Sequence, residues 1–139
     1  MTRGLALVIV LMGASVGSIG LVAWAGGGDD EILVFKPVAP VESLMHAQDE
    51  HFTAIRDLIG NPDADKRFER MAHQAFILAE LGNVNQYNRK AKDYQGWARA
   101  LRDDAKDLAM AASAEDEDAI RDAARRVNSD CKSCHDAYR

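Results

Sequence analysis

The sequence has little of what defines many other protein classes. It contains only two cysteines and three prolines, and no stretch alternates apolar and polar residues as a half-buried β-strand does. Both cysteines belong to one short segment, so no second Cys/His pair is available to complete a tetrahedral zinc site. No repeat or low-complexity tract follows residue 40. These absences favour a single, wholly helical domain.

Positive charge is also in short supply. The formal net charge is −5, and an acidic chain of this kind is a poor nucleic-acid binder. No nucleophile–base pair or metal–carboxylate constellation is visible, so we expect no enzyme. The basic residues near the C-terminus either pair with acids on solvated helix faces or form a docking surface for an acidic redox partner. Expected pairs at helical spacing are Asp118/Arg121 and Asp122/Arg126, and the other basic residues are Arg125, Lys132 and Arg139.

The first 25 residues carry no charge after Arg3 and are nearly all apolar or small. Such a run predicts a secretory signal peptide or an N-terminal membrane anchor. Ala23-Trp24-Ala25 fits the small-x-small cleavage pattern, whereas the length of the run from residue 4 to residue 25 also suits an anchor. Either alternative predicts export, and we expect a periplasmic protein. Residues 26–40, rich in glycine and proline, indicate a linker or extended arm.

The rest of the chain, residues 41–139, predicts one helical domain. Asn61 and Pro62 are expected to begin the second helix, and Gly82 to end it in the left-handed conformation. Gly96 is expected to allow close approach of a ring or another helix. Four amphipathic helices with short loops predict an all-α, antiparallel four-helix bundle. The helical patterns cover residues 41–59, 62–81, 86–112 and a last segment that follows a capping stretch at 113–116.

The two cysteines lie in the segment Cys131-Lys132-Ser133-Cys134-His135. Cys-x-x-Cys-His is the attachment signal for c-type haem, because each thiol adds to a porphyrin vinyl group and the adjoining imidazole binds iron. A redox-active dithiol would stand at the start of a helix, and this pair lies at the end of one. A disulfide across two intervening residues closes too small a loop to stabilise much. We therefore predict one covalent haem c on Cys131 and Cys134, with His135 as proximal iron ligand.

The motif is expected to face the bundle interior. At about 100° per residue, Cys131, Cys134 and His135 project from the same side of a helix as Ile120 and Val127. A haem placed there adds a large apolar surface to a modest core. The protein without haem is therefore expected to be loose or unfolded.

The sequence resembles class II c-type cytochromes, the cytochrome c′ superfamily. These proteins carry the haem motif in their last helix, and Cys131–Arg139 is similar to their pattern Cys-x-x-Cys-His-x-x-aromatic-Arg. The similarity covers about residues 41–139 in helix order and spacing. It implies that Arg139 lies near the proximal imidazole and the haem edge. Tyr138 is expected to be a core aromatic under the haem.

The superfamily divides by what faces the iron opposite the proximal histidine. One branch leaves that position open to nitric oxide or carbon monoxide, and another supplies a methionine from the first helix. Leu44-Met45 is similar to the Leu-Met pair of the second branch, which implies Met45 as distal iron ligand. The alternatives are an ordinary core methionine packed against porphyrin and a histidine ligand, for which His51 is the best candidate.

The expected function is a monohaem electron carrier that cycles between Fe(III) and Fe(II) and serves larger redox proteins. The alternatives are a five-coordinate protein that binds nitric oxide or carbon monoxide, and a small subunit of a membrane oxidoreductase tethered by residues 4–25. Relatives in the superfamily form dimers through their first two helices. The resemblance therefore implies a homodimer with Phe76 and Ile77 as contact residues.

Overall fold

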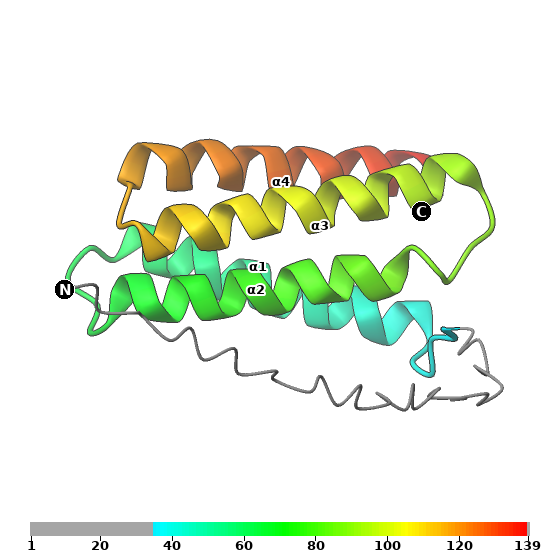
Figure 1. Ribbon diagram of the computed structural model, residues 1–139, viewed down its shortest axis with the longest axis horizontal. Coiled ribbons are helices and arrows are strands. Elements are labelled where there is room, and N and C mark those ends of the chain that lie inside the picture. Colours follow the sequence, from blue (N-terminus) through cyan, green and yellow to red (C-terminus); the bar gives the residue numbers. More distant parts are fainter. Residues whose placement is uncertain (1–34, 139) are drawn as a thin grey trace, which may run out of the picture. The chain divides into compact units, whose positions relative to one another are not determined.

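The computed structural model describes residues 35–138, so the predicted leader of residues 1–25 and Arg139 lie outside the described part. Helices that follow one another in sequence run in opposite directions and pack side by side (Figure 1). The predicted all-α, antiparallel four-helix bundle is confirmed. None of the described helices is long and apolar enough to cross a membrane. The helices are α1 (Val41–Gly60), α2 (Arg67–Asn85), α3 (Lys92–Ser113) and α4 (Glu117–Tyr138).

The apolar core lies toward one end of the bundle. It takes in Phe52, Ile55 and Leu58 of the second half of α1 and Ile120 and Val127 of the first half of α4. The two middle helices, α2 and α3, contribute small and branched side chains that are fully buried and permit close helix packing. These side chains are Ala75, Leu78, Ala105, Leu108, Ala109 and Ala112. The other end of the bundle, where α1 begins and α4 ends, is left for the predicted haem motif.

The second helix begins later than its capping signal predicts. Residues 61–66 form turns, Lys66 adopts a left-handed φ of 49°, and α2 starts at Arg67. The buried Arg67 guanidinium donates to the Leu58 carbonyl at 2.8 Å and pairs with Glu117 at 2.7 Å. One side chain thus links the end of α1, the start of α2 and the start of α4. This tertiary anchor overrides the local Asn61–Pro62 signal, so that prediction is wrong.

Two predictions about glycines are also wrong. Gly82 does not end α2, because the helix continues to Asn85, and no described glycine has a positive φ. Gly82 instead lies where α2 meets α3, and a Cβ there would come within 2.9 Å of the Arg102 backbone nitrogen. A Cβ added at Gly96 would have no neighbouring atom within 4 Å. The close approach predicted for Gly96 therefore occurs at Gly82.

The boundaries of the last two helices also differ from the sequence patterns. The third helix starts at Lys92 rather than near residue 86, and Tyr87 is exposed and packs against Phe35 with tilted rings whose centroids are 4.8 Å apart. In the predicted capping stretch 113–116, the Asp116 carboxylate accepts a hydrogen bond from the Ala119 amide at 3.0 Å. Asp116 is thus the side chain of that stretch that caps α4.

Candidate functional site

The Cys-x-x-Cys-His motif lies in the last two turns of α4. Cys131 and Cys134 are partly buried free thiols, and His135 is exposed. Because the residues are three and four apart on one helix, their side chains share a face. This face continues the buried stripe of Ile120 and Val127, as the sequence predicts.

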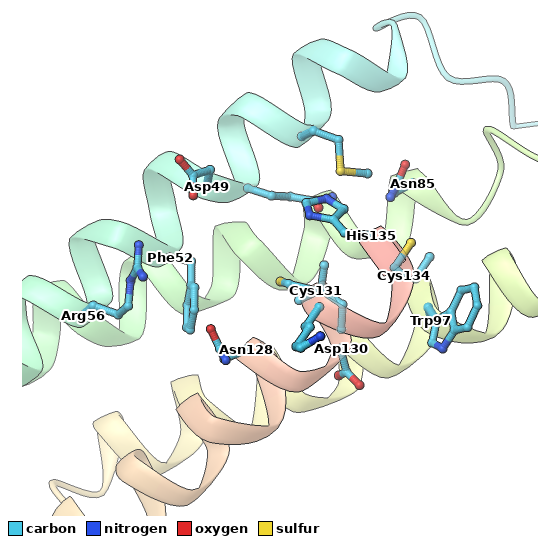
Figure 2. Close-up of a pocket in the computed structure, with 15 residues that line it drawn as sticks. Asp49, Phe52, Arg56, Asn85, Trp97, Asn128, Asp130, Cys131, Cys134 and His135 are labelled. Atoms are coloured by element: carbon cyan, nitrogen blue, oxygen red, sulfur yellow. The ribbon is translucent and has the colours of Figure 1, made fainter. Parts of the chain in front are cut away.

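A cavity of about 370 Å³ lies beside this face, between the start of α1 and the end of α4. Figure 2 shows Asp49 and Phe52 of α1 across the cavity from Cys131 and His135 of α4. Backbone contact between α1 and α4 is sparse, whereas helices that follow one another in sequence pack extensively. The cavity therefore lies in the space that separates α1 from α4. Its remaining wall includes Met45, Gln48, Arg56, Asn85, Trp97, Ala98, Leu101, Asn128, Asp130, Lys132 and Cys134.

A second cavity, of about 640 Å³, adjoins the same motif. It shares Met45, Asp49, Cys134 and His135 with the first. Its other lining residues are Val41, Glu42, His46, Arg89, Tyr94 and Tyr138. The predicted distal residue Met45 and the predicted proximal residue His135 are thus brought together at the boundary of two hollows, although 90 positions in sequence separate them.

The electrostatics of the thiols argue against redox-active cysteines. Burial, followed by the nearby Asp130 carboxyl, raises the pKa of the Cys131 thiol to about 11. Burial also raises the pKa of the Cys134 thiol. A reactive dithiol needs a thiolate at neutral pH, and this environment favours the protonated form. The raised pKa values therefore disfavour a redox-active dithiol at this site.

Tyr138 is held by a set of contacts at the end of α4. Its ring packs edge-on against Tyr94 and Trp97, with centroids 5.3 and 5.8 Å away. Its hydroxyl donates to Asp93 at 2.7 Å, which lowers the pKa of the Asp93 carboxyl, and the Arg89 guanidinium lies 5.2 Å from the ring. These contacts fix the motif-bearing end of α4 against the start of α3. The expected role of Arg139 lies outside the described residues.

Sequence reasoning assigned no role in the site to two polar residues that are buried near the motif. The Asn85 side chain, at the end of α2, accepts a hydrogen bond from the Tyr94 hydroxyl at 2.7 Å. Gln48 is buried in α1, and its Nε2 has no hydrogen-bond partner among residues 35–138. The signal for Gln48 was a carboxamide at an apolar-stripe position of the predicted first helix.

The histidine alternative receives no support from the position of His51. Its Nδ1 lies 2.5 Å from the Gln74 Oε1 of α2, and His51 is not among the residues that line either cavity. His46 lines the second cavity but is exposed. Met45 is therefore the better placed candidate for the distal position.

Four basic residues of α4 pair with acidic side chains. Arg121 pairs with Glu117, Arg125 with Asp122, and Lys132 with Asp136. Arg126 reaches across to Asp104 and Asp107 of α3. The expected Asp118/Arg121 and Asp122/Arg126 pairs are therefore wrong in their partners, because Glu117 and the α3 acids are within reach. Exposed pairs of this kind contribute little to stability.

The residues of the first cavity fit a bound haem. Two thiols and an imidazole share one helix face, and the buried Gln48 amide, which has no partner in the described part of the chain, lines the cavity with them. Apolar side chains, including Phe52, Trp97 and Leu101, offer a surface for a porphyrin. Cys131 and Cys134 would hold the haem and His135 its iron. These assignments agree with the motif and stay predictions.

Comparison with known proteins identifies one family. Residues 85–139 match the family model described as Cytochrome C′, which covers α3 and α4 and implies a covalently bound haem c. The chain matches none of the curated proteins and none of the solved structures with which it was compared. Met45 in α1 lies outside the matched segment, so the methionine-ligated branch is not confirmed. This match over residues 85–139 supports the similarity to the cytochrome c′ superfamily, the class II c-type cytochromes, that the C-terminal motif predicts.

Proposed function

We propose that the protein is a monohaem electron carrier whose iron cycles between Fe(III) and Fe(II), with Met45 as the ligand opposite His135. One observation carries this proposal: Met45 and His135 line the same two cavities from opposite helices. When bound, haem c supplies the redox-active iron, and a thioether ligand favours its reduced form.

The surrounding residues would keep such a site suited to electron transfer. Phe52, Ala98 and Leu101 are buried apolar residues in the cavity wall, and they would exclude water from the haem face. The proposal includes no catalytic turnover.

Replacement of Met45 by alanine tests the proposal. The unaltered protein should show low-spin absorption with a sulfur-to-iron charge-transfer band, because the thioether binds iron. Met45→Ala should lose that band and become high-spin. Met110→Ala removes an exposed methionine of α3 that lies outside both cavities, and should leave the spectrum unchanged. An unchanged spectrum of Met45→Ala would exclude Met45 as ligand.

Gas binding at an open iron is the competing function. Apolar side chains beside Met45, among them Phe52 and Leu101, favour it, since apolar surroundings suit a small neutral ligand. A high-spin spectrum of the unaltered protein that responds to carbon monoxide would support this function. A low-spin spectrum with a sulfur band would instead support the electron carrier.

We further propose export to the periplasm, redox proteins as partners and a homodimer through α1 and α2. Phe76 of α2 is 44% exposed, and an exposed aromatic ring is suited to a subunit contact. Light scattering on the unaltered protein and on Phe76→Glu tests the dimer, which the substitution should weaken. The mass of the purified protein distinguishes a cleaved signal peptide from a retained anchor, because an intact Met1 segment would contradict cleavage.

A further inference from the structure

Gln48 is a buried polar residue whose side-chain amide lacks a hydrogen-bond partner in the described part of the chain. It is only 6% exposed, and its Nε2 amide has no hydrogen-bond partner within residues 35–138. A buried donor that has lost its hydrogen bonds to water and gained none in return destabilises the fold. A group that occupies the neighbouring cavity would satisfy it.

The position of Gln48 indicates which group in the cavity could accept its hydrogen bond. Gln48 lines the first cavity together with Met45 and His135, and it follows Met45 by three residues on α1, which puts the two side chains on one helix face. The nearby Asn85 oxygen already accepts the Tyr94 hydroxyl. Asp49, Asn128 and Asp130 also line the wall and carry acceptors, but none of them accepts a hydrogen bond from the Gln48 Nε2.

We propose that the Gln48 carboxamide is a positioning residue that donates a hydrogen bond to the ligand bound to the iron opposite His135. This inference rests on the proposed function, in which that ligand is the Met45 sulfur. A thioether is a weak acceptor, so the bond would orient the sulfur and slow its release. It would also satisfy the buried amide.

Displacement of Met45 by imidazole tests the proposal in the haem-loaded protein. Gln48→Leu keeps a side chain of similar bulk but removes the donor. We expect the sulfur-to-iron band to be lost roughly three to ten times faster after imidazole is added, the range that one neutral hydrogen bond explains. An unchanged rate would overturn the proposal.

Gln74→Leu is the matched control. Gln74 is a partly buried carboxamide of α2 that pairs with His51 and does not line either cavity. Its substitution should leave the displacement rate unchanged. An equal acceleration in both variants would indicate a general loss of rigidity and would count against the proposal.

A second measurement separates this inference from the identity of the ligand. In a Met45→Ala background, carbon monoxide bound to reduced iron would take the position opposite His135. An amide donor near its oxygen lowers the C–O stretching frequency, so adding Gln48→Leu should raise that frequency. No shift would overturn the role of Gln48. If the unaltered protein lacks the sulfur band, the proposed function fails, and this comparison still decides the role of Gln48.

Discussion

At the residue scale, Asp130 beside the haem motif is an acid whose surroundings disfavour its charged form. It is partly buried, and its Oδ2 has no hydrogen-bond partner in the described part of the chain. Burial, and then the neighbouring Asp104 carboxyl, raises the pKa of Asp130 to about 6, while Arg126 opposes the rise. The folded protein therefore holds this proton more tightly than the unfolded chain.

This raised pKa predicts a definite pH dependence. The contribution of Asp130 to stability is fully present below its unfolded pKa of 3.8 and is lost as pH rises toward its folded pKa of about 6. Asp130→Asn should therefore raise the free energy of unfolding at pH 7, by on the order of 1 kcal/mol because water screens a partly exposed group. Near pH 4 the gain should vanish. Thermal unfolding of the haem-loaded protein at both pH values measures it.

Asp122→Asn provides the control for this measurement. Asp122 is an exposed acid on the same helix and pairs at the surface with Arg125. Its substitution should change the unfolding free energy by less than about 1 kcal/mol at pH 7. If Asp130→Asn destabilises the protein at pH 7, the Asp130 carboxylate is stabilising and the predicted sign is wrong.

At the scale of elements, the contact between α2 and α3 depends on Gly82. A Cβ at this position would lie 2.9 Å from the Arg102 nitrogen and 3.1 Å from the Ala98 carbonyl oxygen. Both atoms belong to the backbone of α3, which a rotamer change does not move. Gly82→Ala should therefore lower the free energy of unfolding by about 1–3 kcal/mol, as overpacking does. Denaturant unfolding of the haem-loaded protein measures the change.

Gly96→Ala is the counterpart on α3. No atom lies within 4 Å of the added Cβ, and alanine favours a helix over glycine. This substitution should raise the unfolding free energy by about 0.5–1 kcal/mol. Equal effects at the two glycines would contradict the close approach of α2 and α3 at Gly82.

Helix existence was easier to predict than helix boundaries. The buried positions of α1, among them Leu44, Phe52 and Ile55, follow the predicted 3.6-residue stripe, because amphipathic spacing reports which face is buried. The start of α2 depends instead on Arg67, whose partners Leu58 and Glu117 lie nine and 50 residues away and belong to other helices. No local capping signal encodes such a contact.

At the scale of the whole molecule, the bundle is incomplete between α1 and α4. Backbone contact between these helices is sparse, and the first cavity separates their motif-bearing ends. A haem held by Cys131 and Cys134 would contact Met45 across this space and so link the two helices. The core of Phe52, Ile120 and their neighbours joins them only at the other end.

Loss of haem attachment should therefore loosen α1 most. In a Cys131→Ala/Cys134→Ala variant, amide hydrogen exchange in the first half of α1 should become faster than in α2 and α3, and the thermal transition should broaden. A variant that keeps both cysteines and carries Met110→Ala serves as the loaded control. A sharp, native-like melt of the haem-free variant would contradict the prediction.

The sequence by itself determined the haem motif, its place on the buried face of the last helix and the helical class. These features depend on spacing within a few residues, so local patterns encode them. Only the tertiary structure brought Met45 and His135 to one cavity, left the Gln48 amide without a partner among residues 35–138 and moved the close helix contact to Gly82. These features depend on where distant segments meet, because burial and hydrogen-bond pairing are set by all four helices together.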